Sequence, residues 1–210
     1  MRRLLLASAI VAASAGAVSA GPVSFNFESL PTNTVTSLNY PVGAAVLNLS
    51  RSSGANFGFQ DLTPFGRPVS WGTRTLSPFT ANVSDQFNAL FTAPGSVTSV
   101  SIEYGDYGQD SGNARFQVWS GAPGVSTLLS DQTQFWNGTI AGGSNGTFVY
   151  SGSNIGSISF WGEVGQFNNS LYWDNININY EDGQVIPLPS VAGMSLAGLA
   201  VIGIRRRRTA

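Results

Sequence analysis

Apolar and polar residues alternate with a period of two along the middle of the chain, a pattern typical of half-buried β-strands. The clearest example is residues 97–104, where apolar side chains alternate with serine and glutamate. Residues 171–180 alternate in the same way, and asparagine takes every outward position from Asn175 on. We predict further strands at residues 23–27, 45–49, 57–60, 87–92, 114–119, 132–136, 147–150 and 155–161.

Turn-forming residues separate these predicted strands. Clusters of glycine, proline, asparagine and aspartate, such as Ala-Pro-Gly at residues 93–95, favour tight turns. About ten short strands without amphipathic helices predict an all-β fold, an antiparallel β-sandwich of jelly-roll type. We expect one such domain over residues 21–180, followed by a linker over residues 181–187.

Charge is distributed unevenly along the chain. The formal net charge of the whole sequence is −1, but six of its ten basic residues are arginines close to the two ends. Between those ends, four arginines oppose all eleven carboxylates, which gives a formal charge of −7. Nucleic acids and anionic lipid surfaces are bound through basic patches. The central domain is therefore not expected to bind nucleic acid.

The chain contains no cysteine, histidine or lysine. Their absence excludes most zinc, haem, copper and iron–sulfur sites, while oxygen ligands for calcium remain. It also removes the usual nucleophiles and tuned bases of enzymes, so we expect a protein that is not an enzyme. A facing pair of carboxylates would still permit glycoside hydrolysis. The acids available for such a pair are Glu103, Asp106, Asp110 and Glu163.

Oxygen-rich segments make calcium the metal to consider. Residues 104–113 form a glycine-rich stretch with two carboxylates, Asp106 and Asp110, although its spacing is not that of an EF-hand loop. If the first and last strands pair, Glu28 comes near Asp174 and forms a second oxygen cluster. We predict weak structural calcium binding by these four residues. The alternative is an ordinary strand connection in which aspartate and glycine only form turns.

Five tryptophans provide rings that could stack against sugars. Trp71 and Trp136 adjoin turn residues, and we predict that these two rings are exposed and bind a polysaccharide. Trp173 lies on the apolar face of its predicted strand and is expected in the core. Trp119 and Trp161 end predicted strands and are expected to cap the sandwich. For each tryptophan the alternative is burial in the core.

Three stretches of the predicted domain form a pattern of their own. They are a Phe-x-x-Leu element at residues 27–30, a hydrophobic strand ending in Gly-Asp at residues 100–106, and an aromatic-Asp-Asn strand at residues 173–176. In these stretches the domain resembles the jelly-roll carbohydrate-binding modules. The resemblance implies the sandwich fold and a structural calcium near the terminal strands.

The first 20 residues have the three parts of a secretory signal peptide. Arg2 and Arg3 form the basic part, residues 4–18 form the apolar part, and small residues precede a predicted cleavage after Ala20. No basic stop follows the short apolar run. We therefore predict export, and the alternative is an uncleaved membrane anchor.

A tail at residues 188–210 begins within a proline motif near the C-terminus and carries no charge before Arg205. Residues 190–204 are apolar or small, and a helix over them would span roughly 22 Å, near the lower limit for crossing a bilayer. Because proline disfavours the interior of a helix, we place the transmembrane helix at about residues 189–204. The basic residues that follow favour the cytoplasmic side. They are Arg205, Arg206, Arg207 and Arg208.

The proline motif, the thin helix and the arginine cluster together resemble the PEP-CTERM sorting signal of bacterial surface proteins. The name-giving tripeptide has glutamate between two prolines, whereas here Leu188 lies between Pro187 and Pro189, as in leucine-containing variants of the signal. The resemblance implies an exosortase, a membrane protease that removes the anchor and releases or attaches the protein outside. The alternative is an ordinary single-pass anchor.

The two ends of the chain fit one route. We predict an exported protein that is held briefly in the inner membrane and then sorted to the cell envelope or to the extracellular matrix of a biofilm. Three roles stay open for the domain: a structural or adhesive component, a lectin-like polysaccharide-binding module, and a carbohydrate-active hydrolase. A tryptophan-lined groove would favour the second role, and a flat Asn/Ser/Thr surface would favour the first.

Overall fold

Two antiparallel sheets face each other in the computed structural model, which describes residues 21–61, 71–77, 85–105, 112–136, 145–163 and 171–181. These residues all belong to one compact unit, Ala20–Gly183. No helix among them is long and apolar enough to cross a membrane. The predicted signal peptide, transmembrane helix and arginine cluster lie outside the described residues.

One sheet has seven strands in the order β11-β8-β13-β6-β5-β2, with β1 also paired to β13. The first and last strands of the sandwich therefore lie side by side, with Val23 opposite Ile178 and Phe25 opposite Ile176. The strands of this sheet are β1 (Val23–Phe25), β2 (Thr34–Val35), β5 (Phe57–Asp61), β6 (Arg74–Ser77), β8 (Ser96–Gly105), β11 (Asn145–Ile155) and β13 (Tyr172–Glu181).

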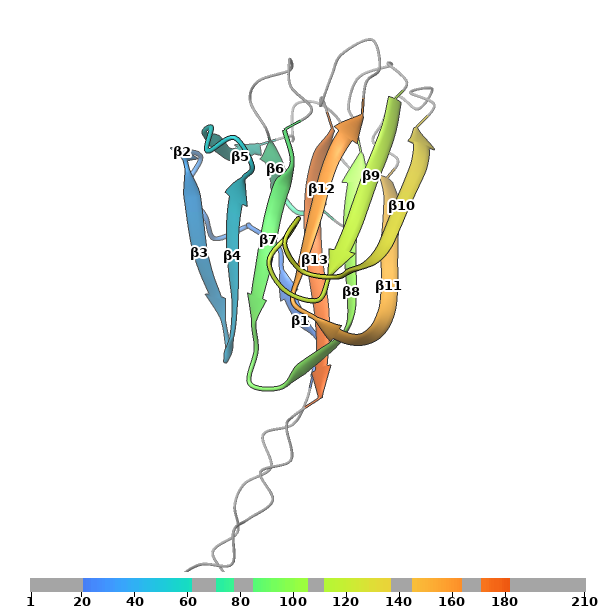
Figure 1. Cartoon of the computed structure of the whole chain (residues 1–210). Coiled ribbons are helices and arrows are strands. Elements are labelled where there is room, and N and C mark those ends of the chain that lie inside the picture. The colour runs from blue at the N-terminus through green and yellow to red at the C-terminus, as the bar shows by residue number, and fades with distance from the viewer. Residues whose placement is uncertain are drawn as a thin grey trace, which may run out of the picture. The chain divides into compact units, whose positions relative to one another are not determined.

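The other sheet has six strands in the order β10-β9-β12-β7-β4-β3. Figure 1 looks onto this sheet, with β3 at the left and β10 at the right. Its strands are β3 (Ser37–Val42), β4 (Ala45–Arg51), β7 (Phe87–Thr92), β9 (Gly112–Trp119), β10 (Leu128–Trp136) and β12 (Ser157–Glu163).

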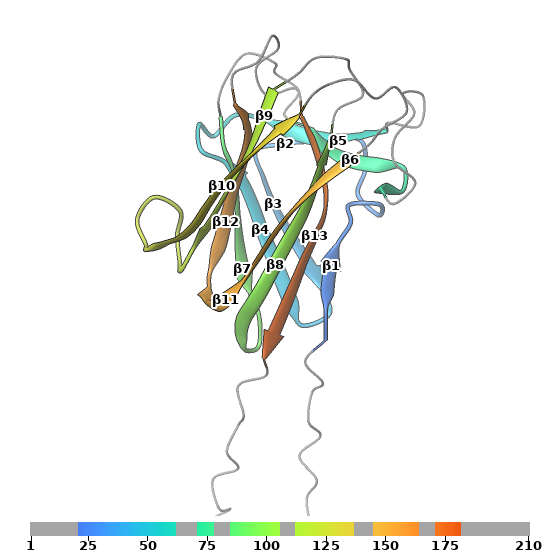
Figure 2. The same ribbon diagram turned by 90° about the vertical axis from the view of Figure 1, so that its right-hand side faces the viewer.

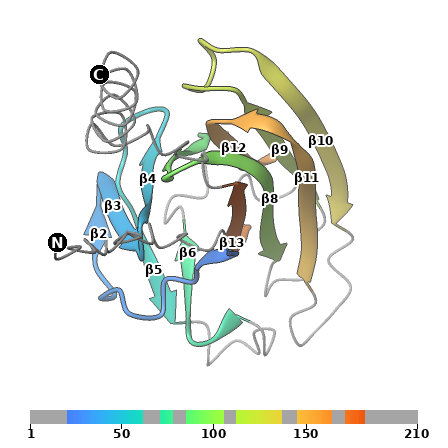
Figure 3. The same ribbon diagram turned by 90° about the horizontal axis from the view of Figure 1, so that it is seen from below.

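The chain passes repeatedly from one sheet to the other. From β6 onward it crosses at β7, back at β8, and again at β9, β11, β12 and β13. Seen from below, the strands form two layers (Figure 3). The fold is an antiparallel β-sandwich of jelly-roll type, as predicted from the alternation of apolar and polar residues.

Aromatic side chains from both sheets fill the space between them. Phe116 of β9 stacks on Phe148 of β11 with ring centroids 5.2 Å apart, and Phe160 of β12 packs against Trp173 of β13 at 4.8 Å. All four are fully buried, and each contributes about 1.5–3 kcal/mol by leaving water. The prediction that Trp173 belongs to the core is confirmed.

Glutamine side chains join the two sheets at one edge. β10 and β11 are edge strands of different sheets, and Figure 2 shows this side of the sandwich. Gln132 donates from Nε2 to the carbonyl of Val149 at 3.1 Å, and Gln134 donates to the carbonyl of Thr147 at 3.4 Å. These amides satisfy carbonyls that an edge strand would otherwise present to another chain.

Three strands were missed by the sequence pattern. β2 has two residues and β6 has four, which is too short for a clear alternation. β3 contains Pro41, a residue type that usually interrupts a strand. In the six-stranded sheet β3 lies at the edge and pairs only with β4. An edge strand tolerates proline because the missing N–H need not face a neighbour.

Gly156 separates two strands where one was predicted at residues 155–161. A Cβ atom here would lie 2.7 Å from Gly121 Cα, so only glycine fits beneath the β9–β10 turn. Its N–H donates to the carbonyl of Trp119 at 2.9 Å, and its carbonyl accepts from Phe91 N–H at 3.0 Å. Ile155 therefore ends β11, and β12 begins at Ser157.

Candidate functional site

Trp71 is buried, with 2% of its surface exposed, so the prediction of an exposed ring is wrong. Its indole N–H donates to Glu103 Oε2 at 2.7 Å, and its ring packs with Tyr172 in a small cluster separate from the main core. The neighbouring turn residues indicated a surface position. In the fold the ring covers polar groups of the seven-stranded sheet instead, which leaves no free face for a sugar.

The other tryptophans whose side chains the structure describes do not form an exposed groove either. Trp161 is 6% exposed and lies within β12 rather than at its end, while Trp119 ends β9 as predicted and is half-buried. Trp136 is the last residue of β10, and its side chain lies outside the described structure. No tryptophan side chain that the structure describes is exposed.

Glu28 fixes the turn that precedes β6. Its Oε1 accepts hydrogen bonds from the backbone N–H groups of Thr73 at 2.6 Å and Arg74 at 2.8 Å, and its Oε2 accepts one from Thr73 Oγ1 at 2.8 Å. Gly72, with φ +59°, passes so close that a Cβ atom would overlap the carboxylate. The Glu28 carboxylate is therefore engaged by the protein's own donors.

Asp174, the other carboxylate of the predicted terminal-strand cluster, is fully buried on β13. Its Oδ1 accepts a hydrogen bond from Asn175 N–H at 2.7 Å, and Glu103 of β8 is its partner in register. The described residues contain no group of three acidic side chains that could hold a metal. Calcium binding through Glu28 and Asp174 stays a prediction.

Asp106 and Asp110 follow β8 and lie outside the described residues. Calcium binding through this segment stays a prediction.

Charged and aromatic side chains gather on the outer face of β9, β10 and β12. Ala114, Phe116 and Val118 of β9 are fully buried between the sheets, so the residues between them face outward. The register places Asn113 beside Glu163 and Phe135, and Arg115 beside Trp161. We call this surface the Arg115 face, and it comprises Asn113, Arg115, Asp131, Phe135, Trp161 and Glu163.

Arg115 links the three strands of this face. Its Nε and Nη2 donate to the two carboxylate oxygens of Asp131 at 2.9 and 2.7 Å, and its Nη1 donates to Glu163 Oε1 at 2.7 Å. Gln117 donates a further hydrogen bond to Asp131 Oδ2 at 3.0 Å. All three nitrogens of the guanidinium group are therefore directed at carboxylates within the face.

These hydrogen bonds shift the ionisation of the partners. Hydrogen bonds to Asp131 and Glu163 raise the pKa of Arg115 well above its usual value. The hydrogen bond from Arg115 lowers the pKa of Asp131, with burial opposing it and Gln117 adding to it. One arginine and two carboxylates give the cluster a formal charge of −1.

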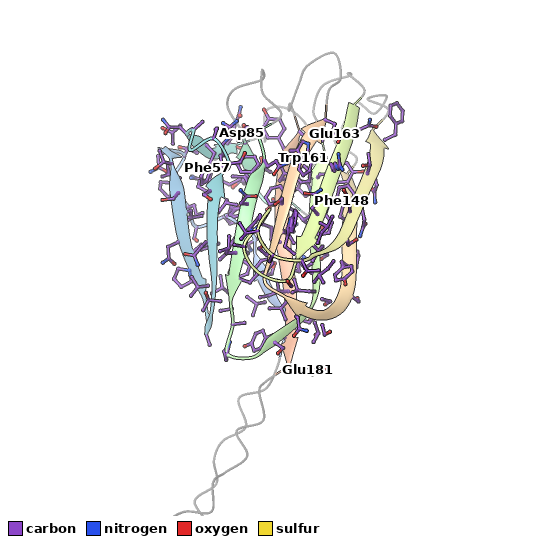
Figure 4. The ribbon with its side chains drawn as sticks, in the orientation of Figure 1. Phe57, Asp85, Phe148, Trp161, Glu163 and Glu181 are labelled. Atoms are coloured by element: carbon purple, nitrogen blue, oxygen red, sulfur yellow. The ribbon has the colours of Figure 1, made fainter. Side chains whose placement is uncertain are left out.

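Trp161 lies beneath this cluster. The Arg115 guanidinium carbon is 5.3 Å from the centroid of the Trp161 ring, a cation–π distance, and this cover explains why the ring is only 6% exposed. Figure 4 shows Trp161 and Glu163 close together near one end of β12.

Phe135 is the exposed aromatic ring of the face. It is 70% exposed. The described strands present few large apolar side chains to solvent, and Phe135 is the aromatic one among them. Its partner in register is Asn113, next to the Arg115–Asp131–Glu163 cluster. An apolar ring thus lies beside amide and carboxylate groups.

Uncharged polar residues occupy much of the remainder of this sheet's outer side, together with Leu90 of β7, which is 38% exposed. Asn39 lies opposite Asn48, Ser37 lies opposite Ser50, and Ser159 Oγ donates to Asn88 Oδ1 at 2.7 Å. On the other sheet, Asn179 and Asn177 reach hydroxyl groups of β8 in the same manner. Both outer surfaces carry rows of amide and hydroxyl groups.

A pocket of about 380 Å³ lies where β7 turns into β8, next to Ser120 and Asn154. Its lining is made of apolar, glycine, serine, threonine and asparagine residues, and it contains no ionisable side chain. It therefore offers no acid or base for catalysis.

Sequence reasoning had not singled out Arg115, Asp131 or Phe135. The alternation in residues 114–119 and 132–136 does place Arg115 and Phe135 on the outward side of their strands. It does not reveal that β9 and β10 pair with Phe135 opposite Asn113 and Asp131 opposite Gln117. The missing information was the register between strands.

No family model matches the chain, and no curated protein matches it. Among solved structures, it is similar to the K1 cleaved adhesin domain of Lys-gingipain from Porphyromonas gingivalis, with 10% identity, 77% of this chain and 99% of that chain covered, and a TM-score of 0.48. A family 35 carbohydrate-binding module from Clostridium thermocellum has 12% identity, coverage of 76% and 98%, and a TM-score of 0.39.

A family 11 carbohydrate-binding module from Clostridium thermocellum, in complex with a β-1,3-1,4-mixed-linked tetrasaccharide, has 13% identity, coverage of 76% and 96%, and a TM-score of 0.34. Similarities of this size say nothing of a shared ligand. The properties of the site therefore rest on its own residues.

Proposed function

We propose that this protein is an exported component of the cell envelope or extracellular matrix and that its β-sandwich is a non-catalytic structural or adhesive module. The observation that carries this proposal is the distribution of side chains on the two outer surfaces. Amide and hydroxyl rows face solvent, while Trp71, Trp161 and Trp173 are buried. Such surfaces favour adhesion through many weak hydrogen bonds rather than capture of a sugar in a tryptophan-lined groove.

The route to the surface is part of the proposal. The signal peptide at residues 1–20 would start export, and the tail at residues 188–210 would be processed by an exosortase. Mass spectrometry of the mature protein tests this route. We expect a new N-terminus at Gly21 and loss of the arginine cluster, and a mature chain that still ends in Ala210 would overturn the processing.

Adhesion can be tested on the native matrix. Cells that export the full chain are washed in low salt and in about 1 M salt, at which exposed charge pairs are largely screened. We expect the protein to stay in the matrix fraction in both washes, because its outer surfaces are mostly uncharged. Recovery of all the protein in the culture medium at both salt concentrations would contradict an adhesive role.

The hydrolase alternative finds no support among the described acids. Asp131 and Glu163 are both held by Arg115, and Glu103 accepts the indole N–H of Trp71. A Gly-x-Ser-x-Gly sequence occurs at residues 142–146, and its serine lies outside the described residues. A chain without histidine lacks the base of a catalytic triad. We therefore keep a non-catalytic role.

A lectin-like role has one specific observation in its favour, the exposed Phe135 ring beside polar groups of the Arg115 face.

A further inference from the structure

We propose that the Arg115 face binds a neutral polysaccharide, with the Phe135 ring stacking on the apolar side of a sugar and Asn113, Asp131 and Glu163 hydrogen-bonding its hydroxyl groups. This inference rests on the proposed adhesive function and names the molecule that the module adheres to. It replaces Trp71, which is buried, as the stacking residue.

The Phe135 ring provides the apolar part of the site. It keeps 70% of its surface in water, which costs free energy that a stacked sugar ring would partly recover. Phe135 lies on β10, which is paired along residues 128–136 with β9, so a strand and not a loop holds its backbone. A site on a paired strand is better ordered for binding than one on a loop.

The charges on the face decide which polysaccharide fits. Arg115 donates three of its five guanidinium N–H groups to Asp131 and Glu163, so its positive charge is already compensated within the face. The two carboxylates leave the cluster with a formal charge of −1. An acidic polysaccharide would be repelled, whereas a neutral one meets fixed acceptors.

The carboxylates can still accept hydrogen bonds from a sugar. An ionised carboxylate has about four lone-pair positions, and Glu163 Oε1 accepts a hydrogen bond from Arg115 at one of them. Asp131 accepts from Arg115 at both oxygens and from Gln117 at one of them. Because Arg115 and Gln117 hold these carboxylates in place, a sugar hydroxyl meets acceptors that are already oriented.

Trp161 supports the face from below and does not stack on the ligand itself. Arg115 covers its ring at 5.3 Å and leaves it 6% exposed. Phe135 is thus the ring of this face that a sugar can reach.

The test measures binding of the full chain to cellulose, β-1,3-glucan, dextran and galactomannan, with alginate as the acidic counterpart. The decisive variant is Phe135→Ala. Its matched control is Val149→Ala, because Val149 is 58% exposed on the outer face of β11 in the other sheet. Both positions are exposed, so neither substitution is expected to disturb folding.

We expect at least one neutral polysaccharide to bind, with a Kd about tenfold weaker for Phe135→Ala and unchanged for Val149→Ala. Binding should be no weaker in high salt, and alginate should bind less well than the neutral polymers. The inference is overturned if no neutral polysaccharide binds, if alginate binds more tightly, or if both variants lose affinity equally.

Failure of this inference can be told apart from failure of the proposed function. If the neutral polymers do not bind but the protein stays in the matrix fraction, the adhesive role stands and its partner is another molecule, such as a protein. If retention in the matrix is also lost, both proposals fail.

Discussion

Arg51 and Asp85 form a buried ion pair, with Arg51 Nε 2.9 Å from Asp85 Oδ2 and the two side chains 1% and 2% exposed. Arg51 also donates to the carbonyl of Asn56, and its guanidinium carbon lies 5.9 Å from the centroid of the Phe87 ring. Asp85 accepts hydrogen bonds from Ser52 and Ser53. The pair therefore ties the turn after β4 to the start of β7.

Replacing Asp85 is expected to destabilise the sandwich strongly. Asp85→Asn removes the negative charge beside a buried guanidinium, and breaking a buried pair costs about 3–5 kcal/mol. Urea denaturation of the purified domain measures the change in the free energy of unfolding. The matched control is Asp131→Asn, whose ion pair is about one-third exposed and should cost less than about 1 kcal/mol. Equal losses for the two variants would contradict the prediction.

Acid should weaken the fold through the same residue. Burial acts to raise the pKa of Asp85, but hydrogen bonds from Ser52 and Ser53 and the charge of Arg51 outweigh it and lower the pKa. A carboxyl group with a lowered pKa stabilises the folded state above its unfolded pKa of about 3.9, and this contribution is lost as the pH falls through the folded pKa. Denaturation curves below about pH 4 should show this loss, and Asp85→Asn should show less of it.

Gly72 should tolerate no side chain. Gly72→Ala places a methyl group against the Glu28 carboxylate at a position with φ +59°. Gly43→Ala is the control, because Gly43 has φ +60° and nothing within 4 Å of an added Cβ. The control should cost about 1 kcal/mol from backbone strain alone, and Gly72→Ala should cost clearly more, since the turn at Thr73 must also move. Thermal melting of the two variants measures the difference.

Arg115 should protect Trp161 from water. Arg115→Ala removes the group 5.3 Å from the Trp161 ring, so we expect a red shift of tryptophan fluorescence and faster quenching by acrylamide. Stability should fall by no more than about 1 kcal/mol, because the Arg115 side chain is 34% exposed. An unchanged spectrum would mean that other groups cover the ring.

Calcium is tested by thermal melting. If the segment with Asp106 and Asp110 binds the ion, calcium at about ten times its Kd should add about 1.4 kcal/mol and raise the melting temperature by about 3 °C. The double variant Asp106→Asn with Asp110→Asn should lose this rise. Identical melting in calcium and in chelator would contradict calcium binding.

Much of the fold could be predicted because the alternation of apolar and polar residues within a strand indicates which of its side chains are buried. The predicted strand at residues 87–92 coincides with β7, and those at residues 97–104 and 171–180 differ from β8 and β13 by one residue at each end. β3 was not predicted, because a proline in an edge strand cannot be distinguished in the sequence from a proline that interrupts a strand. The break between β11 and β12 at Gly156 was not predicted. A side chain at this position is excluded by Gly121, which is distant in the chain.

The candidate site could be predicted only in part. Alternation places Arg115 and Phe135 on outward positions, but it does not distinguish an exposed ring from a covered one. Trp71 and Trp161 both point away from the core between the sheets. Trp71 is nevertheless buried with Tyr172 and Glu103, and Trp161 is buried beneath Arg115.

The sequence by itself determined the class of fold, the acidity of the central domain, and the absence of histidine, cysteine and lysine chemistry, because these depend on residue type and on a period of two along one strand. Only the tertiary structure decided which side chains meet. Arg115 contacts Asp131 and Glu163, and Phe135 lies beside Asn113, through the register of three strands. Register is set by packing between distant segments, and no local pattern in the chain encodes it.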